Sequence, residues 1–366
     1  MYTDRRDFLK VGVAATVASS LPGSIVARAA ETAGIDLKMA GYPFEHVKGL
    51  MTGKVQIDRC NTSFEVGKIG DLNTHIFSGP RSLDVTEVGL SPYMLAFANE
   101  EFRAYTLIPV FPLRLFRHKS IFVHADAGIE EPSQLKGRRV ATPGYSSTSL
   151  TWIRGMLQDE YGVRPEDIEW VISAEDSSTS ASGKTSKQEQ VFPDGLKFSV
   201  GPEGKDESDL LVNRDVDALF HAAEPRAFIE GHPKVRRLFA DARQVERDYY
   251  AKTGIFPIMH AVAIRTDLIN QNPWLPEAVF EGYSASKAMA FSDMRQKWFL
   301  RTLPWFAQEL ESTEALMGRN FFPYGVEANR KSLEALFRYS HEQGLASREL
   351  KIEEIFEPAT LRLTEV

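Results

Sequence analysis

The stretch EEPSQLKGRRVATPGYSSTSLTWIRGMLQDEYGVRPEDIEWV, from Glu130 to Val171, has the pattern that decides the fold. It predicts, in order, a helix, a strand, a loop rich in Gly and Ser, a second helix and a second strand. Strands that alternate with helices in this way belong to α/β units with parallel strands. The sequence therefore predicts a doubly wound sheet around this stretch.

Two β-rich runs bracket this α/β region, one from Leu107 to Val123 and the other from Ile255 to Ile264. Long apolar runs of this kind suit strands that cross from one lobe into another. Two such crossings mean that the chain leaves the first lobe, builds the second and returns. We therefore expect two lobes that close about a hinge.

The expected lobes follow from the crossings. Lobe one takes residues 35–116 and then residues 259–366, in which helical patterns dominate towards the C-terminus. Lobe two takes residues 117–258. The polar run SAEDSSTSASGKTSKQEQ, Ser173 to Gln190, lacks a hydrophobic period and reads as a surface insertion. Its GKTS is no phosphate loop, because no glycine stands five residues before Gly183.

Composition excludes several classes of protein. The chain has 366 residues, of which 43% are hydrophobic, enough to bury one large core or two medium ones. Its formal net charge of -7 argues against a nucleic-acid partner, which would need a basic face. The single cysteine, Cys60, allows neither an intrachain disulfide nor a cysteine cluster. No short metal-ligand spacing appears, so we expect no metal and no cofactor.

The first 29 residues have the pattern of an export signal. Arg5 and Arg6 precede a weakly apolar stretch that ends in small residues at Ala27 and Ala29, which is typical of a twin-arginine leader. The apolar part is too short and too diluted to span a membrane. Asp4 departs from the pattern, because Ser or Thr usually precedes the arginines. We expect twin-arginine export, cleavage after Ala29 and a mature protein in the periplasm.

Six strings along the chain resemble one known family. They are VGLSPYMLA, IPVFPLRLFRHKSI, LKGRRVATP, WIRGMLQDEYGVRPEDI, GIFPIMHAV and FPYGVEANRKSLEALFRYSHEQGL. Together they resemble the 4,5-dihydroxyphthalate decarboxylase-like family from about Ile35 to about Glu357. The resemblance implies the α/β, two-lobed type II periplasmic-binding-protein fold and a small aromatic carboxylate in the cleft between the lobes. The insertion is longer than the family leads us to expect, and AAEPRAF replaces an expected Pro-rich loop.

Helix N-termini are the first candidates for binding an organic anion, because they present unpaired N–H groups and a favourable dipole. Ser91, followed by Pro92, is predicted to cap a helix of lobe one. Ser146, Ser147 and Thr148 lie in the loop ahead of a lobe-two helix. The alternative for both is a plain helix cap.

Three arginines are candidate cations for the same anion. Arg114 and Arg117 lie three apart near the presumed hinge, so in a strand they would face opposite sides and only one would reach the cleft. Arg226 follows a lobe-two strand, where open α/β sheets bind ligands. His118 and His260 lie one in each crossing and are candidate proton donors. The alternatives are solvated arginines and structural histidines.

The sequence is compatible with two functions. The resemblance implies decarboxylation of 4,5-dihydroxyphthalate to protocatechuate, which makes the chain a candidate carboxy-lyase and requires one base, one acid and one clamp. On that reading Arg114 or Arg117 clamps the spare carboxylate, and His118 or His260 moves protons. The alternative is a non-catalytic periplasmic solute-binding protein that delivers an organic anion to an ABC-type or related membrane transporter.

Overall fold

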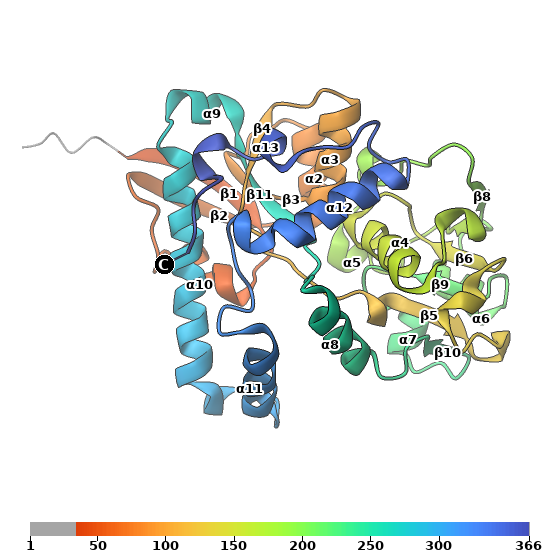
Figure 1. Cartoon of the computed structure of the whole chain (residues 1–366). Coiled ribbons are helices and arrows are strands. Elements are labelled where there is room, and N and C mark those ends of the chain that lie inside the picture. The colour runs from red at the N-terminus through yellow and green to blue at the C-terminus, as the bar shows by residue number, and fades with distance from the viewer. Residues whose placement is uncertain (1–33, 366) are drawn as a thin grey trace, which may run out of the picture. The chain divides into compact units, whose positions relative to one another are not determined.

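The computed structural model describes residues 34–365, and the predicted leader lies outside this range. The described residues belong to one compact unit that contains two sheets. Figure 1 shows the first sheet beside α9 (Thr266–Gln271) and α10 (Leu275–Gln296), and the second beside α4 (Thr148–Tyr161) and α6 (Glu207–Val212). Among the described helices, none combines the length and the apolar character that a membrane crossing requires.

The first sheet has the strand order β2-β1-β3-β11-β4. Its strands are β1 Ile35–Gly41, β2 Cys60–Val66, β3 Val85–Gly89, β4 Tyr105–Ile108 and β11 His260–Arg265. The pairs β1–β2 and β1–β3 are parallel, whereas β11 runs antiparallel between β3 and β4. The register places His260 opposite Gly89. The strand that returns from the second lobe thus delivers a histidine to the carboxyl end of β3.

The second sheet has the order β10-β5-β9-β6-β7-β8. Its strands are β5 Ile121–His124, β6 Arg139–Thr142, β7 Glu169–Ile172, β8 Lys197–Val200, β9 Ala218–Phe220 and β10 Val235–Arg237. The four strands from β9 to β8 are parallel, as the alternating pattern predicts, and β5 and β10 are antiparallel to their neighbours. Each sheet is therefore mixed, and the α/β class with two lobes holds.

The first crossing is not one continuous strand. β4 ends at Ile108 and β5 begins at Ile121, and between them Arg114 pairs with Ile258 only as an isolated bridge. Pro109 and Pro112 account for the break, because proline cannot donate to a strand ladder. The β-rich composition predicted a longer strand than these prolines allow.

The remaining helices differ widely in length. They are α1 Lys48–Met51, α2 Ile69–Phe77, α3 Leu90–Asn99, α5 Thr179–Ser182, α7 Arg226–Ile229, α8 Ala242–Thr253, α11 Phe306–Met317, α12 Arg330–Glu342 and α13 Ile352–Ile355. The N-cap of α3 is Gly89, which lies two residues before Ser91. Ser91 thus lies within the first turn of α3, and the prediction that it caps the helix is wrong.

The C-terminal segment contacts both lobes. Leu333 and Leu336 of α12 belong to the core around α3, whereas Leu345 belongs to the core of the second sheet. The Tyr339 hydroxyl donates to Asp159 on α4 at 2.6 Å. Helix α12 therefore ties the two lobes together beside the crossings (Figure 1).

Candidate functional site

A cavity of about 270 Å³ lies between the carboxyl ends of strands from both sheets. Lobe one contributes the loop after β1, the start of α2 and the turn from β3 into α3, and lobe two contributes the start of α4 and the loop after β9. The polar and charged side chains of its wall include Tyr42, Arg117, Ser147, Thr148, Ser149, Asp176, Ser178, Ser182, Thr185, Glu189, His221 and His260. This placement is the usual one for ligands of open α/β sheets.

The polar segment 173–190 covers this cavity, so its interpretation as a surface insertion is wrong. Its backbone accepts a hydrogen bond from the Tyr42 hydroxyl at Ala181 (3.0 Å). The amide of Lys184 donates to Asp71 of α2 at 3.3 Å. Glu189, which is buried, accepts from Asn73 at 3.3 Å. The segment is held by polar contacts with lobe one, which explains why it shows no hydrophobic period.

Arg117 is the cation of the cavity wall. Its side chain is 3% exposed, and it donates to the Ala222 carbonyl oxygen at 2.6 Å and to the Met259 sulfur at 3.3 Å. Within the described residues it forms no ion pair, and its Nη2 has no recorded partner. Burial lowers the pKa of Arg117 to about 10, so the guanidinium stays charged at neutral pH. The charge of Glu246 offsets part of this effect, but among the described residues no carboxylate lies within ion-pair distance of Arg117. An anion in the cavity would relieve the remaining cost of burying the charge.

The N-terminus of α4 faces the same space. Ser147 is the N-cap, and its hydroxyl accepts from the Leu150 amide at 3.4 Å. The backbone N–H groups of Thr148 and Ser149 have no acceptor among the described residues. These groups and the helix dipole favour a carboxylate. The Thr148 hydroxyl itself accepts from the Ser91 amide at 2.9 Å, which joins the two lobes at the cavity.

His260 forms a buried pair with Glu87 on the lobe-one wall. The two are joined between Nδ1 and Oε1 at 2.5 Å, and the other oxygen of Glu87 accepts from the Tyr42 amide at 2.9 Å. The Tyr42 ring stacks on the imidazole with centroids 6.1 Å apart. When Nδ1 donates to the Glu87 carboxylate, Nε2 is the ring nitrogen left to exchange a proton with a ligand. No described residue is recorded as a partner of Nε2.

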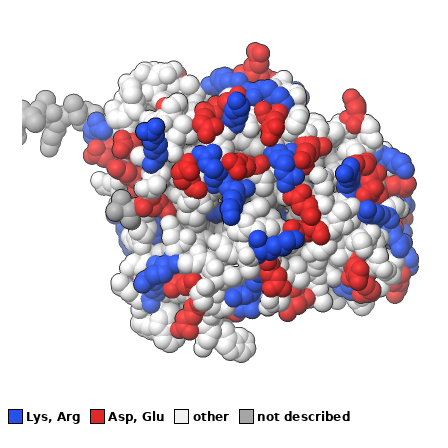
Figure 2. Space-filling view, viewed as in Figure 1, with Lys and Arg blue, Asp and Glu red and all other residues white. Residues whose placement is uncertain are grey.

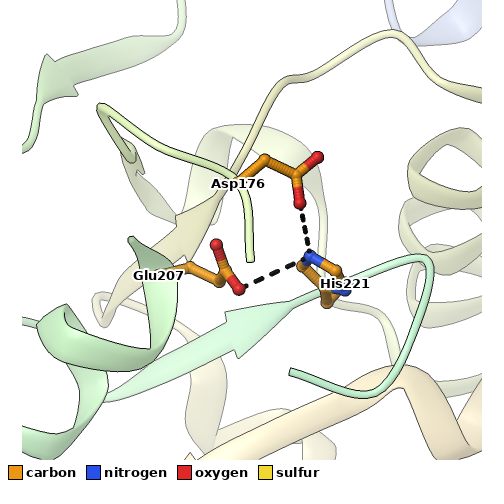
Figure 3. Close-up of side chains that lie close together, drawn as sticks. All are labelled: Asp176, Glu207 and His221. Carbon is orange, nitrogen blue, oxygen red and sulfur yellow. Dashed lines mark hydrogen bonds and ion pairs between the residues drawn. The ribbon is translucent and has the colours of Figure 1, made fainter. Parts of the chain in front are cut away.

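A second histidine, His221, follows β9 on the lobe-two wall and lies between two carboxylates (Figure 3). Its Nε2 is 3.2 Å from Asp176 and 3.5 Å from Glu207. Burial by itself would lower the pKa of His221, but the hydrogen bond to Asp176 and the two negative charges outweigh it and raise this pKa. Burial raises the pKa of Glu207. For Asp176 the opposing effect of burial is overcome, chiefly by His221, so its pKa is lowered.

The same three residues have the types and spacing of a metal site, since one ligand atom from each lies within 4.8 Å of the others. Nδ1 of His221 is 2.9 Å from the Ala223 carbonyl oxygen and 3.0 Å from the Ala223 amide, so the tautomer decides which of the two it pairs with. When Nδ1 donates to the carbonyl oxygen, Nε2 of the neutral ring keeps the lone pair that a metal needs. When Nδ1 accepts from the amide, Nε2 carries a proton and faces the two carboxylates as a donor. Asp176 Oδ1 also accepts from the Ser178 amide at 2.7 Å.

Of the residues predicted from the sequence, four line the cavity. They are Arg117, Ser147, Thr148 and His260. Ser91 and Ser146 are fully buried next to it but do not line it. The Ser91 hydroxyl is 3.2 Å from that of Thr151, and the Ser146 hydroxyl donates to the Gln188 oxygen at 2.7 Å. These two hydroxyls serve the scaffold that holds the α4 N-terminus.

The other three predicted residues lie away from the cavity wall. His118 is buried between the rings of Phe239 and Tyr249, at 5.4 and 5.1 Å, and burial lowers its pKa to about 4. A ring in this environment stays neutral at physiological pH, so it does not fit the role of a proton donor.

Arg114 and Arg226 have acceptors of their own. Arg114 donates to Asn329 at 2.5 Å and to the Phe256 carbonyl oxygen at 2.6 Å, which ties the crossing to the C-terminal segment. Arg226 begins α7 and forms ion pairs with Asp206 at 3.0 Å and Asp209 at 2.7 Å. Of the two crossing arginines, only Arg117 reaches the cavity. Arg226, the first residue of α7, pairs with carboxylates at the start of α6 instead.

Comparison with known proteins identifies the family of this chain. The chain is 34% identical over 328 residues to a 4,5-dihydroxyphthalate decarboxylase of Comamonas testosteroni, and the match covers 89% of this chain and 98% of that protein. The chain belongs to the 4,5-dihydroxyphthalate decarboxylase family. A protein of the same name from Pseudomonas putida is 30% identical over 59% of this chain and 81% of its own length. The model of the NMT1/THI5-like family matches residues 114–185.

Solved structures show the fold. A periplasmic sulfonate-binding protein from Methylobacillus flagellatus matches with a TM-score of 0.53 at 13% identity, over 90% of this chain and 93% of that one. The periplasmic aliphatic sulphonate-binding protein of Escherichia coli matches with a TM-score of 0.50 at 14% identity, over 88% and 92%. The predicted periplasmic-binding-protein fold is confirmed.

Sequence reasoning missed Glu87, Asp176 and Glu207 as members of the site. Glu87 carried a usable signal, because a carboxylate in the middle of the buried strand VTEVG needs a partner. Asp176 and Glu207 carried weaker signals. Asp176 lies in the segment interpreted as a surface insertion, and Glu207 begins a short helix after a polar loop.

Proposed function

We propose that this protein decarboxylates 4,5-dihydroxyphthalate to protocatechuate in the cavity between its lobes. The observation that carries the proposal is Arg117, a buried guanidinium on the cavity wall without an ion-pair partner among the described residues. Family membership supplies the reaction class, since the relatives bear this enzyme's name. An aromatic dicarboxylate suits a small cavity that combines a cation, a helix N-terminus and apolar side chains.

Each step of this reaction is assigned to particular residues of the cavity. Arg117 and the α4 N-terminus bind the carboxylate that the product keeps. Asp176 accepts a hydrogen bond from the hydroxyl para to the departing carboxylate, which raises the electron density at the carbon that bears it. His260 is the general acid and donates a proton from Nε2 to that carbon. The carbon–carboxyl bond then breaks, its electron pair returns to the ring, and carbon dioxide leaves.

A second candidate function uses the same binding site but involves no chemical reaction. The likeness to sulfonate-binding proteins and the Arg117 site favour a receptor that captures an organic anion and passes it to a membrane transporter. The twin-arginine leader and the periplasmic location that we infer from residues 1–29 suit this function as well. In both cases we propose that residues 117–258 close as one lobe onto residues 35–116 and 259–366 around the ligand.

The decisive experiment supplies purified protein with 4,5-dihydroxyphthalate and follows the products by chromatography. The enzyme proposal predicts protocatechuate and carbon dioxide in equal amounts, with repeated turnover. Calorimetry on the same sample measures binding. Saturable binding of 4,5-dihydroxyphthalate without any product would overturn the enzyme proposal and support the receptor.

A further inference from the structure

A second cavity, of about 650 Å³, lies beside the two crossings. Its wall includes Arg114 of the first crossing, Phe256 of the second and the beginning of α12. Among the described residues, it shares no wall residue with the cavity that Arg117 lines. Arg114 and Arg117, three positions apart in the chain, thus line two different cavities. We call the one at Arg114 the hinge cavity.

Arg114 is a buried cation in this wall and has no counterion. The residue is 4% exposed, and its recorded hydrogen bonds go to neutral acceptors, which are Asn329 Oδ1 and the carbonyl oxygens of Phe256 and Pro323. Among the described residues it forms no ion pair, and its Nε has no recorded partner. The Phe256 ring, 4.7 Å from the guanidinium carbon, offsets part of the cost of burying the charge. Burial lowers the pKa of Arg114 to about 9, so the group is charged at neutral pH and favours an anion nearby.

Lys331, the second residue of α12, is the other cation of this wall without a counterion. It is exposed, and within the described part of the chain its amino group has no recorded acceptor. Glu327 and Glu334 also line the cavity, but both pair with Arg330. Figure 2 shows acidic and basic side chains interleaved along α12, and the arginines of this helix have carboxylate partners. Lys331 and the buried guanidinium therefore leave the wall with an excess of positive charge.

Aromatic side chains complete the wall and suit a flat ligand. They are Tyr250, Phe256 and Phe321. A cavity of about 300–1,000 Å³ that combines apolar surface with a few charged groups is typical of small-molecule sites. We propose that the hinge cavity is a second binding site for a small aromatic carboxylate, whose carboxylate faces Arg114 and Lys331. Segments of both crossings form the wall, so this ligand lies at the hinge and outside the cleft.

Calorimetry with phthalate tests the proposal by counting binding sites. Phthalate carries carboxylates on an aromatic ring but lacks the hydroxyl that the proposed reaction needs, so turnover does not enter the measurement. Wild-type protein is expected to bind two phthalate molecules per chain. Lys331→Glu should weaken one of the two sites by at least about tenfold, because repulsion replaces the attraction of a charged group. Arg117→Gln should weaken only the other site.

Lys54→Glu is the matched control, since Lys54 is an exposed lysine that lines neither cavity. It makes the same change in net charge as Lys331→Glu and should leave both sites intact. Glutamate is favourable in the first turn of a helix, so Lys331→Glu should fold. Circular dichroism and the melting temperature check the fold of each variant. A folded Arg114→Gln should weaken the same site as Lys331→Glu.

The binding data separate this proposal from the proposed function. One phthalate per chain in the wild type, lost in Arg117→Gln, would overturn the hinge site. A second site that is unchanged in folded Lys331→Glu, or that Lys54→Glu weakens equally, would overturn it as well. A single site that Lys331→Glu removes and Arg117→Gln keeps would support the hinge site and contradict the anion site at Arg117. Failure of the proposed decarboxylation would leave the number of phthalate sites unchanged.

Discussion

Two histidines line the cavity from opposite lobes, and their surroundings differ. His260 has one carboxylate partner, Glu87, on Nδ1, and no described residue is recorded on its Nε2. His221 has carboxylates at Nε2 and the Ala223 backbone at Nδ1, so both of its ring nitrogens are engaged. The same residue type therefore serves two purposes. A histidine with a free ring nitrogen can exchange a proton with a ligand, whereas a histidine whose two ring nitrogens are engaged is held in place by its partners.

The difference shows why residue type alone is a weak guide to function. His118 is the third case, with no hydrogen-bond partner at either ring nitrogen among the described residues and aromatic rings around it. Burial lowers the pKa of His118, the two carboxylates beside His221 raise its pKa, and His260 lines the cavity. The role of each follows from which nitrogen is occupied and by what.

Replacement of His260 should have the largest effect, because it removes the group with the free nitrogen. His260→Gln is expected to lower kcat by about 10²–10⁴-fold, the range for loss of a general acid. Affinity for 4,5-dihydroxyphthalate should change little. Steady-state kinetics and calorimetry measure the two quantities, and His232→Gln, away from the cavity wall, is the control. A variant with normal kcat would show that His260 does not move the proton.

Replacement of Arg117 should act on binding more than on chemistry. Hydrogen bonds to charged groups contribute about 1.5–3 kcal/mol, so Arg117→Gln should weaken ligand binding by roughly 10–100-fold. Calorimetry with 4,5-dihydroxyphthalate or phthalate measures this. Arg226→Gln is the matched control, since Arg226 is half exposed and pairs with Asp206 and Asp209. If Arg226→Gln weakened binding as much as Arg117→Gln, the assignment of the anion site would be wrong.

Replacement of His221 should change how the stability of the folded protein depends on pH. Its pKa in the folded protein is raised above the ordinary value of 6.5, so the folded state holds the proton more tightly than the unfolded state does. The resulting stability is fully present below pH 6.5 and is lost as the pH rises through the raised pKa. We expect the melting temperature of wild type to fall by a few degrees more than that of His221→Asn across this window. Parallel curves for the two proteins would contradict a raised pKa of His221.

The smallest effect should come from the contact that holds the polar segment over the cavity. Tyr42→Phe removes the hydrogen bond to Ala181 and the one that the hydroxyl accepts from the Ile69 amide. Loss of about 1 kcal/mol should raise KM by roughly fivefold and leave kcat nearly unchanged. Hydrogen exchange in residues 176–189 should become faster. Unchanged exchange there would show that this hydroxyl does not hold the segment.

The fold could be predicted from the sequence, because the fold depends on local sequence patterns. The alternation between Glu130 and Val171 predicts parallel strands, and the two β-rich runs predict the crossings. Boundaries were less accurate where single residues decide them. Pro109 and Pro112 divide the first crossing, and Gly89 takes the cap position expected for Ser91.

The site could be predicted from the sequence only in part, because contacts between segments that lie far apart in the sequence form it. Arg117 and Arg114 look alike in sequence, and only the position of Asn329, more than 200 residues later, shows that Arg114 is engaged elsewhere. The polar segment lacked any hydrophobic signal, since its contacts with lobe one are polar. A hydrophobic period in the sequence reveals only apolar packing. It therefore gave no sign that hydrogen bonds hold the polar segment over the cavity.

In the proposed reaction His260 delivers a proton to the ring carbon that loses its carboxylate. Turnover of 4,5-dihydroxyphthalate in D₂O, followed by proton NMR of the protocatechuate, tests it directly. With His260 as the donor, the product carries one deuterium at the position that the carboxylate leaves, and His260→Gln loses product formation while calorimetry still detects binding. Product that forms at the wild-type rate in His260→Gln, or no product from the wild type, would contradict it.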